Sequence, residues 1–309
     1  MIVFSWNVRG AVGKAFSRAC KEYIRVHKPD IVALQETRCS GDNAKKVIKN
    51  LGFNNFILVE ARGYSGGIWI LWRNDNFNIK PIQLHSQYIH AIVEENNKAH
   101  WLLSIIYGSP REMERREAWK EIREFARSNT KPWLMVGDFN AIANINEKKG
   151  GAPADRRKCL EFANWISDCN LIDMEAKGSK FTWRGAVRDN RDRVFERLDR
   201  GPCNSDWRIQ FPEAYVMCLT RTHSDHHPLL IKCNGDITVN RNRPYRFETF
   251  WMQHQDFSKM LQDSWEGCNG NYFQKVQDLK EKIEIWKKQV FGNIFHRKKR
   301  LLARIDGIQ

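Results

Sequence analysis

The chain has 309 residues, 42% of them hydrophobic and 12% aromatic, so it can bury a full core and lacks the low hydrophobicity typical of a disordered protein. Its 51 Lys and Arg against 36 Asp and Glu give a formal net charge of +15, which favours a polyanionic partner such as nucleic acid or an acidic membrane surface. Its longest apolar runs have the length of a core strand, not the roughly 18 residues that a membrane span requires, so we do not expect an integral membrane protein.

The strand-like runs and the amphipathic stretches alternate from Ile2 to Ile231. Helical spacing predicts helices near 14–27, 42–50, 111–127 and 155–168. Apolar, β-branched and aromatic runs predict strands at Ile2–Trp6, Ile31–Leu34, Phe56–Val59, Gly67–Trp72, Ile79–Leu84, Ile89–Val93, Trp101–Tyr107, Trp133–Val136, Phe181–Trp183, Val194–Leu198, Ala214–Leu219 and Pro228–Ile231. These strands are too many for one ordinary sheet. We therefore predict an α/β fold, a four-layer sandwich of two mainly antiparallel sheets flanked by helices.

The composition changes towards the C-terminus. Asn234–Arg243 is polar and irregular, and Pro244 interrupts any continuing element. Beyond it, apolar residues keep i, i+3, i+4 spacing from Phe247 to Trp265 and again from Val276 to Val290, which predicts a C-terminal helical extension. The predicted domains are residues 1–235 and a helical arm of residues 244–309.

The N-terminus and the cysteines indicate in which cellular compartment the protein is expected. Met1 leads directly into the strand-like run Ile2–Trp6, without the basic segment and cleavage site of a secretory signal. The eight Cys are at least ten residues apart, so they form no CxxC pair for zinc or redox chemistry. We expect free thiols in a reducing, intracellular compartment.

Several predicted strands end in carboxylate and amide side chains. These are Asn7, Glu36, Asp138 and Asn140, and Asp225 and His226 directly precede a further strand. Taken singly, each is more often a turn former, but four such strand ends in one chain favour a shared site at one sheet edge. Oxygen and amide ligands without thiolates suit Mg²⁺ or Mn²⁺ better than Zn²⁺.

Such a set could hydrolyse a phosphoester. One carboxylate would hold the metal, a second would take the proton of an attacking water, and a protonated His braced by a further Asp would stabilise the transition state. The candidate brace for His226 is Asp199, within Glu196-Arg197-Leu198-Asp199.

In chain order, seven motifs resemble those of the endonuclease/exonuclease/phosphatase superfamily, which has the DNase-I-like fold. They are Ser5-Trp6-Asn7-Val8-Arg9-Gly10, Pro29-Asp30-Ile31-Val32-Ala33-Leu34-Gln35-Glu36-Thr37, Gly63-Tyr64-Ser65-Gly66-Gly67, Tyr107-Gly108, Gly137-Asp138-Phe139-Asn140, Arg197-Leu198-Asp199 and Ser224-Asp225-His226-His227-Pro228. Within this superfamily the chain is most similar to the endonuclease domain of non-LTR (LINE-type) retrotransposons, especially those of plants. In those elements a helical stretch like the one beginning at Tyr245 leads to a reverse transcriptase.

The resemblance implies a divalent metal ion, Mg²⁺ or Mn²⁺, held mainly by Glu36. Asn7 would be a ligand or lie next to one, and Asp225 would support both the metal and His226. Asp138 would orient and deprotonate the attacking water.

The resemblance also implies roles around the substrate phosphate. Asn140 and Tyr107 would hold the scissile phosphate, and the Asp199–His226 pair would stabilise the transition state. The positions that shape the site and contact DNA would be Thr182 and Ser224.

Basic side chains near these motifs are further candidates for DNA contact. Part of the abasic-site repair branch has an acidic residue where this chain has Arg9, a difference that removes a possible ligand and adds a cation near the phosphate. The loop between Trp183 and Val194 carries four Arg; in the resembling endonucleases the corresponding hairpin enters the minor groove, where Arg favours narrow, A·T-rich segments. A solvated turn is the simpler alternative. The candidates are Arg9, Trp183, Arg184, Arg188, Arg191 and Arg193.

The sequence therefore favours an Mg²⁺-dependent endonuclease that nicks one strand of duplex DNA and leaves a 3′-hydroxyl, as in target-site nicking by a retrotransposon in the nucleus. The alternatives are an abasic-site endonuclease, a phosphatase for phosphoinositide-type substrates, and a catalytically silent remnant that binds nucleic acid. The expected partners are duplex DNA and, in a retrotransposon, element RNA or a reverse transcriptase region, with no membrane.

Overall fold

The computed structural model describes residues 1–73, 77–95, 100–187, 192–235, 252, 254–267 and 272–290. It divides into two compact units, Met1–Ile237 and Thr238–Gln309. Pro244 and most of the polar segment Asn234–Arg243 lie outside the described residues.

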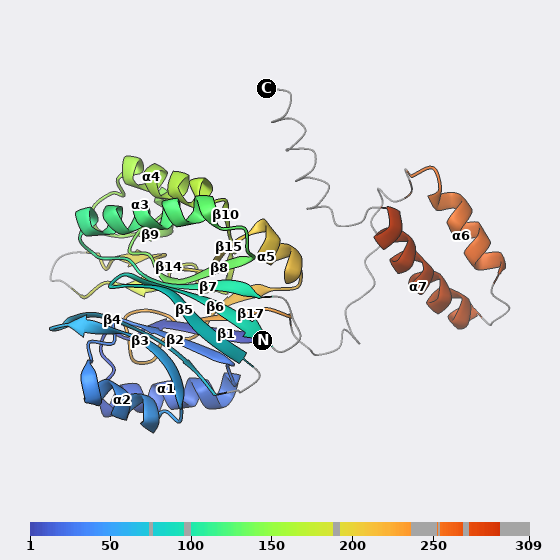
Figure 1. The fold of residues 1–309 in the computed structure, drawn as a ribbon. Helices are drawn as coiled ribbons and strands as arrows, with labels where there is room; N and C mark the ends of the chain where they lie inside the picture. Colours follow the sequence, from blue (N-terminus) through green and yellow to red (C-terminus); the bar gives the residue numbers. More distant parts are fainter. Residues whose placement is uncertain are drawn as a thin grey trace. The chain divides into compact units, whose positions relative to one another are not determined.

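Two large sheets form the centre of the first unit (Figure 1). In spatial order, the first sheet contains β11 (Ala176–Gly178), β16 (Tyr215–Cys218), β17 (Leu229–Lys232), β1 (Ile2–Asn7), β2 (Ile31–Gln35), β4 (Ser65–Trp72) and β3 (Asn55–Arg62). The second contains β10 (Leu171–Asp173), β15 (Pro202–Asn204), β8 (Trp133–Asp138), β7 (Trp101–Tyr107), β6 (Tyr88–Glu95) and β5 (Phe77–His85), and β14 (Asp199–Arg200) also pairs with β8. A small third sheet joins β12 (Trp183–Arg184), β13 (Phe195–Glu196) and β9 (Lys148–Lys149).

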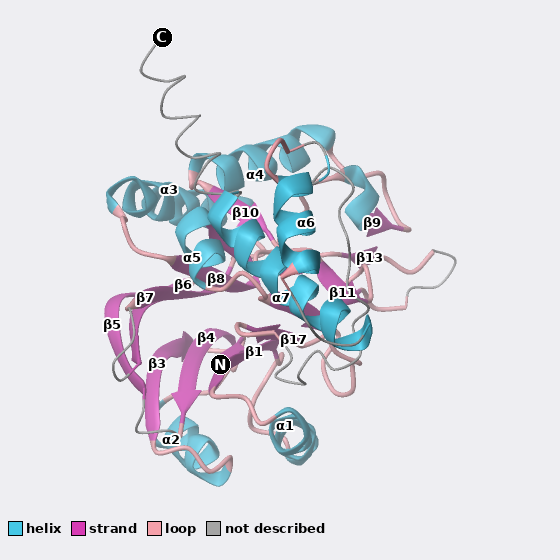
Figure 2. Cartoon of the chain, turned by 90° about the vertical axis from the view of Figure 1, so that its right-hand side faces the viewer, coloured by secondary structure: helices cyan, strands magenta, loops and turns pink. Residues whose placement is uncertain are grey.

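Helices cover the outer face of each large sheet. Figure 2 shows α1 (Lys14–His27) and α2 (Gly41–Asn50) on one side of the stacked sheets, and α3 (Glu112–Ser128) and α4 (Arg156–Asp168) on the other. The parallel pairs are β1–β2, β7–β8 and β11–β16, and the other neighbours are antiparallel. The predicted four-layer sandwich of two mainly antiparallel sheets is therefore confirmed.

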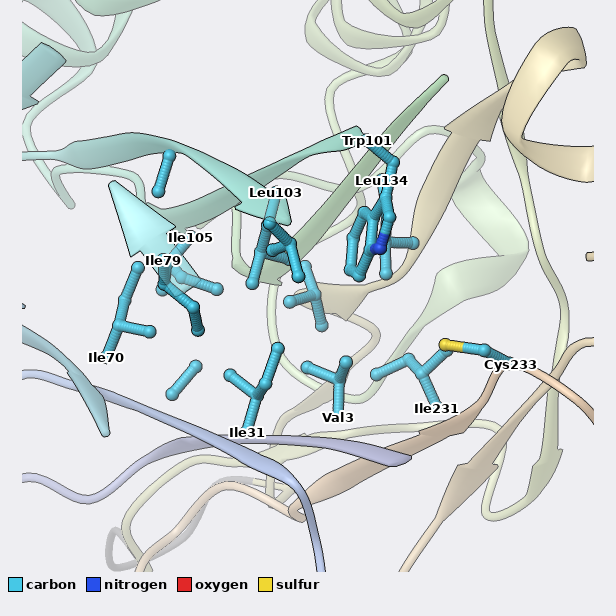
Figure 3. Packing of buried hydrophobic residues seen from close by; sticks show 14 of the residues in the cluster. Val3, Ile31, Ile70, Ile79, Trp101, Leu103, Ile105, Leu134, Ile231 and Cys233 are labelled. Carbon is cyan, nitrogen blue, oxygen red and sulfur yellow. The ribbon is translucent and has the colours of Figure 1, made fainter. Parts of the chain in front are cut away.

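The layers follow from the alternation of side chains along the strands. In β2, Ile31 and Ala33 pack between the two sheets, whereas Val32 and Leu34 pack beneath α1 and α2. Figure 3 shows the apolar layer between the sheets, where Ile31 faces residues such as Leu103 of the opposite sheet. Because both faces of the central strands are buried, these strands are continuous apolar runs in the sequence.

The short elements around the second sheet differ from the sequence predictions. The runs Phe181–Trp183 and Val194–Leu198 shrink to the two-residue strands β12 and β13. The sequence did not indicate α5 (Ser205–Gln210), η1 (Ile145–Glu147) or the strands β9, β10, β11, β14 and β15. The strands among them have only two or three residues, which is too short for a periodic signal, so backbone pairing with neighbours distant in the chain decides their conformation.

The second unit contains α6 (Phe257–Glu266) and α7 (Tyr272–Val290), with Phe257, Ile283 and Trp286 as its buried core. Helix α6 overlaps the first predicted arm stretch, of which residues 247–251 and 253 lie outside the described residues. The N–H of Phe257 donates to the carbonyl of His254 in a turn at the start of α6. No helix in the described part of the chain is long and apolar enough to cross a membrane.

Candidate active site

The ends of β1 and β8 bring Asn7 and Asp138 together, although they belong to different sheets. The Asn7 side-chain amide donates a hydrogen bond to Asp138 Oδ2 at 2.8 Å, and both residues are completely buried. Gly137 makes this strand end possible: its φ is +144°, and a Cβ at this position would lie 2.1 Å from the carbonyl oxygen of Ile106. Only glycine fits there, which explains the Gly-Asp pair at the end of β8.

Asn140 completes the environment of the Asp138 carboxylate. Its backbone N–H donates to Asp138 Oδ1 at 2.9 Å, and its side-chain amide donates to Oδ2 at 3.0 Å and to the Gly108 carbonyl at 2.8 Å. Asn140 has a φ of +47°, a left-handed conformation that Asn tolerates better than most residues. These bonds fix the orientation of the carboxylate.

His226 lies between two carboxylates. Strand β14 pairs with β8 so that Asp199 stands opposite Asp138. His226 Nδ1 is 2.9 Å from Asp199 Oδ2, and its Nε2 is 3.8 Å from Asp138 Oδ2. The brace predicted for His226 is therefore in place, and the second ring nitrogen faces the carboxylate predicted to act as the base.

The charges of these buried groups are strongly coupled. Burial disfavours the charged form of His226, but the carboxylates of Asp199 and Asp138 outweigh it and raise the pKa of His226 to about 9. Burial also raises the pKa of Asp138 to about 7, against the opposing effect of the His226 charge. At neutral pH His226 is thus an imidazolium ion, and Asp138 titrates close to neutrality.

Thr182 and Ser224 hold the backbone around this pair. The hydroxyl oxygen of Thr182 accepts the N–H groups of Leu198 and Asp199, each at 2.9 Å, and that of Ser224 accepts the N–H of His226 at 3.1 Å. Both side chains are buried. Their observed contacts position Asp199 and His226, and contact with DNA by either residue stays a prediction.

Tyr107, at the end of β7, brings a hydroxyl to the same region. Its side chain is buried, and burial together with the carboxylates of Glu36 and Asp138 raises its pKa above the ordinary value for a phenol. At neutral pH Tyr107 is therefore an uncharged phenol close to both acidic groups.

Glu36 and Asp225 converge on the guanidinium of Arg9. Arg9 Nη1 lies 2.5 Å from Asp225 Oδ2, and Arg9 Nε lies 4.0 Å from Glu36 Oε1, while Arg38 also pairs with Glu36. A single positive group thus faces both carboxylates. The donors are hard oxygens without thiolates, which fits Mg²⁺ or Mn²⁺. The Arg9 side chain is 51% exposed, so it has room to leave this position.

A second group of ligand-type atoms comes from Asp138, Asp199 and His226, whose ligand atoms lie within 4.8 Å of one another. A protonated imidazole cannot coordinate a cation. Because the pKa of His226 is raised to about 9, this trio suits proton chemistry better than metal binding.

The predicted DNA-binding side chains lie partly beside the site. Trp183 donates its indole N–H to Asp225 Oδ2 at 3.0 Å, so this half-buried ring is tied to a site carboxylate. Arg184 and Arg193 border the loop that follows β12, whereas Arg188 and Arg191 lie outside the described residues.

A buried ion network behind Asp199 was not predicted. Glu147 bonds Arg197 at 3.0 Å and also pairs with Arg200, and both arginines pair with Asp173, at 2.9 and 2.5 Å. Glu147 Oε2 also accepts the N–H of Ala143 at 2.7 Å, so it connects the segment after Asn140 to β14. The sequence offered one signal for this network, because Arg200 is a charged residue directly after Leu198-Asp199. In the structure Arg200 is 1% exposed.

Comparison with known proteins places this geometry in a family. Residues 4–226 match the endonuclease/exonuclease/phosphatase family. Three solved structures share the fold. The endonuclease domain of TRAS1, a telomere-specific non-LTR retrotransposon, is 13% identical, with 76% of this chain and 99% of that chain covered and a TM-score of 0.57. An AP endonuclease from Leishmania major is 14% identical, with 74% and 86% of the two chains covered and a TM-score of 0.58, and a 3′–5′ exonuclease from Neisseria meningitidis is 17% identical, with 76% and 100% covered and a TM-score of 0.57. At these identities the similarity establishes the fold alone.

A curated protein, the probable RNA-directed DNA polymerase from transposon X-element of Drosophila melanogaster, is 23% identical over 233 residues. The match covers 74% of this chain and 24% of that protein, so the chain spans about a quarter of the length of this relative. The predicted resemblance to retrotransposon endonucleases is thereby confirmed.

Proposed function

This chain belongs to the endonuclease/exonuclease/phosphatase family, and from that premise we propose that it is an Mg²⁺-dependent endonuclease that cuts one strand of duplex DNA and leaves a 3′-hydroxyl. The observation that carries the proposal is the buried series Asp199–His226–Asp138–Asn7, next to the carboxylate of Glu36. It provides a base, an acid and an adjacent set of cation ligands.

Glu36 would hold the divalent cation, with Asn7 and Asp225 at its side. When bound, the cation polarises the phosphoryl group and offsets charge on the leaving oxygen. The convergence of Glu36 and Asp225 on one guanidinium supports this placement, since the same oxygens would face any cation bound there.

Asp138 would accept the proton of the attacking water. The amides of Asn7 and Asn140 fix its carboxylate, so its orientation is set before the substrate binds. The His226 imidazolium, braced by Asp199, would donate a hydrogen bond to the phosphoryl oxygen on which charge develops.

Tyr107 would donate its hydroxyl hydrogen to the scissile phosphate. Asn140 would bind the same phosphate if its amide exchanged the bond to Gly108 for one to the substrate. The two residues border the Asp138 carboxylate from different strand ends, which suits a phosphate held between them.

Duplex DNA is the proposed substrate because the chain carries a net charge of +15 and Arg9 lies at the proposed cation site. We further propose that the enzyme acts in the nucleus as part of a retrotransposon, with element RNA or a reverse transcriptase region as partner. The named polymerase relative supports this context.

A plasmid-relaxation assay tests the proposal. Supercoiled DNA incubated with Mg²⁺ should become open circles with 3′-hydroxyl ends that a polymerase can extend, and excess EDTA should stop the reaction. A duplex with a single abasic site, assayed in parallel, should show no preference for cutting at that site. Intact plasmid under all metal conditions would reject the endonuclease and favour a silent binding protein, while cleavage confined to the abasic duplex would favour a repair enzyme.

A further inference from the structure

Three arginines near the site carry no ion pair among the described residues. They are Arg184 on β12, Arg193 just before β13, and Arg221 in the segment between β16 and β17. Of the other arginines around the site, Arg9 pairs with Asp225, Arg38 with Glu36, and Arg197 and Arg200 with Glu147. Arg115 also has no ion pair in the described part of the chain, but its Nη1 donates to the carbonyl of Ser109 at 2.5 Å. Within the described structure, the three are therefore cations beside the site without a carboxylate partner.

The backbone brings Arg184 and Arg193 together beside the Asp225 loop. The N–H of Arg184 bonds the carbonyl of Asp225 at 3.0 Å, and the N–H of Gly185 bonds the carbonyl of Val194 at 2.8 Å, so β12 joins the Asp225 loop on one side and β13 on the other. Arg193 Nε donates to the carbonyl of Gly185 at 2.8 Å, which fixes its guanidinium across β12.

The segment that carries Arg221 is held by α1. The hydroxyl of Tyr23 donates to the carbonyl of Thr220, and it lies 3.0 Å from the hydroxyl of Thr222. Both neighbours of Arg221 are thus anchored to Tyr23 of α1, which restrains the backbone on either side of Arg221.

The positive charges act on one another. Partial burial, followed by the charges of Arg184 and Arg193, lowers the pKa of Arg221. Asp225, whose negative charge acts against this repulsion at Arg221, already binds Arg9 and the indole of Trp183. In addition, the Arg184 Nε is buried and has no hydrogen-bond partner. Unpaired, mutually repelling guanidiniums next to a catalytic site are the arrangement that a bound anion stabilises.

The cavity bounded by α3 and α4 offers an instructive contrast. It has a volume of about 300 Å³ and also contains basic side chains. There Lys148 pairs with Glu196 at 3.0 Å, Lys158 with Glu112 at 2.5 Å and Arg116 with Glu161 at 2.7 Å. Of the basic residues that line the cavity, this leaves Arg115 without an ion pair to any described residue. The unpaired cluster is the better candidate for a polyanion.

We propose that Arg221, Arg184 and Arg193 together bind one backbone phosphate of the DNA, next to the position of the cut. The phosphate group matches the forked donors of the guanidiniums, and it is read without regard to base identity. Arg221 is the residue that completes this site, which we name the three-arginine site. The inference rests on the proposed function, because it assigns the DNA strand as the source of the phosphate.

Binding measurements in EDTA, where no cutting occurs, test the three-arginine site. Duplex affinity is measured by fluorescence anisotropy between about 50 and 300 mM KCl for the wild type, Arg221→Gln and the control Arg127→Gln. Arg127 is an exposed residue in the last turn of α3, so its replacement removes the same charge elsewhere. Arg221→Gln should weaken binding about tenfold and reduce the slope of log K against log salt, by up to about 0.9 for loss of the whole contact. Arg127→Gln should match the wild type.

The triple variant Arg184→Gln, Arg193→Gln, Arg221→Gln tests whether the contact is shared. If the three arginines share one phosphate, the slope of log K against log salt should change by about 0.9 in total in the triple variant. If each arginine binds its own phosphate, the change should be roughly three times that value. Arg221→Lys should restore part of the affinity, since it keeps the charge without the fork. Two results would overturn the three-arginine site. One is a folded Arg221→Gln protein with an unchanged slope of log K against log salt, and the other is a loss of duplex affinity in Arg221→Gln that equals the loss in Arg127→Gln. Because these data need no cutting, they stand apart from the plasmid assay, and a protein that binds with the expected slopes but never nicks would contradict only the proposed function.

Discussion

Two residues of the site hold protons whose release sets a pH range. Asp138 must be ionised to accept a proton, and burial raises its pKa to about 7. His226 must keep its proton; burial opposes the charge, but Asp199 and Asp138 raise its pKa to about 9. We therefore expect the nicking rate to rise with pH through about 7 and to fall through about 9. A bound cation would favour the Asp138 carboxylate and move the acid limb to lower pH.

The measurement is kcat/KM against pH at saturating Mg²⁺. His226→Asn should lower the rate by about 10² to 10⁴ and remove the alkaline limb. The acid limb should persist and move to higher pH, because the His226 charge that lowers the pKa of Asp138 is lost. An alkaline limb that persists in this variant would show that another group titrates there.

Glu36 is the residue on which the cation depends most. Glu36→Ala should reduce nicking by a factor of at least about 10², since it removes the main ligand of a cation worth several kcal/mol to the transition state. The control is Glu124→Ala, an exposed carboxylate on α3 that should behave as the wild type. If Glu36→Ala has a native circular dichroism spectrum and relaxes plasmid at the normal rate, the metal assignment is wrong.

At the scale of elements, the ion network of Glu147 ties β14 to the segment that follows Asn140. The Arg200 side chain is 0% exposed and that of Glu147 is 11% exposed, so replacing one partner leaves a buried charge without compensation. Glu147→Gln should therefore lower the free energy of unfolding by about 3 kcal/mol or more, measured by urea denaturation.

An exposed ion pair in the same domain provides the comparison. Arg116 pairs with Glu161 at 2.7 Å, and both side chains are more than a third exposed. Glu161→Gln should cost less than about 1 kcal/mol. Equal losses for Glu147→Gln and Glu161→Gln would mean that the buried network adds nothing to the stability of β14.

The loop between β12 and β13 is the element expected to select the DNA sequence. Replacing residues 185–192 by a short Gly-containing turn should keep nicking but redistribute the nick sites, because Arg side chains that prefer narrow minor grooves would be lost. Sequencing of the cut ends gives the nick map. A map identical to that of the full-length loop would assign selectivity to another part of the protein.

At the scale of the whole molecule, each of the two units has its own described core. The core residues of the first unit end at Cys233, and the core of the second lies on α6 and α7. A chain ending at Asn240 should therefore fold and nick plasmid at close to the full rate. The checks are a cooperative thermal transition and the relaxation assay. A truncated chain that remains unfolded would show that the first unit needs the arm.

Much of this protein could be read from the sequence because its central elements obey local rules. The helix predicted over 14–27 coincides with α1, and the run Trp101–Tyr107 is β7, since amphipathic and doubly buried segments have distinct periodicities. The residue types at the strand ends also pointed to a cluster of oxygen ligands, because parallel topologies collect strand ends at one edge.

Only the tertiary structure decided which of these groups meet. Asn7 bonds Asp138 across 131 positions of sequence, and Asp199 reaches His226 through the two-residue strand β14, which exists because β8 pairs with it. Arg221 and the Glu147 network escaped prediction for the same reason. An isolated charge carries no periodic signal, and its burial, its pairing or its lack of a partner is set by backbone segments that come together only when the chain folds.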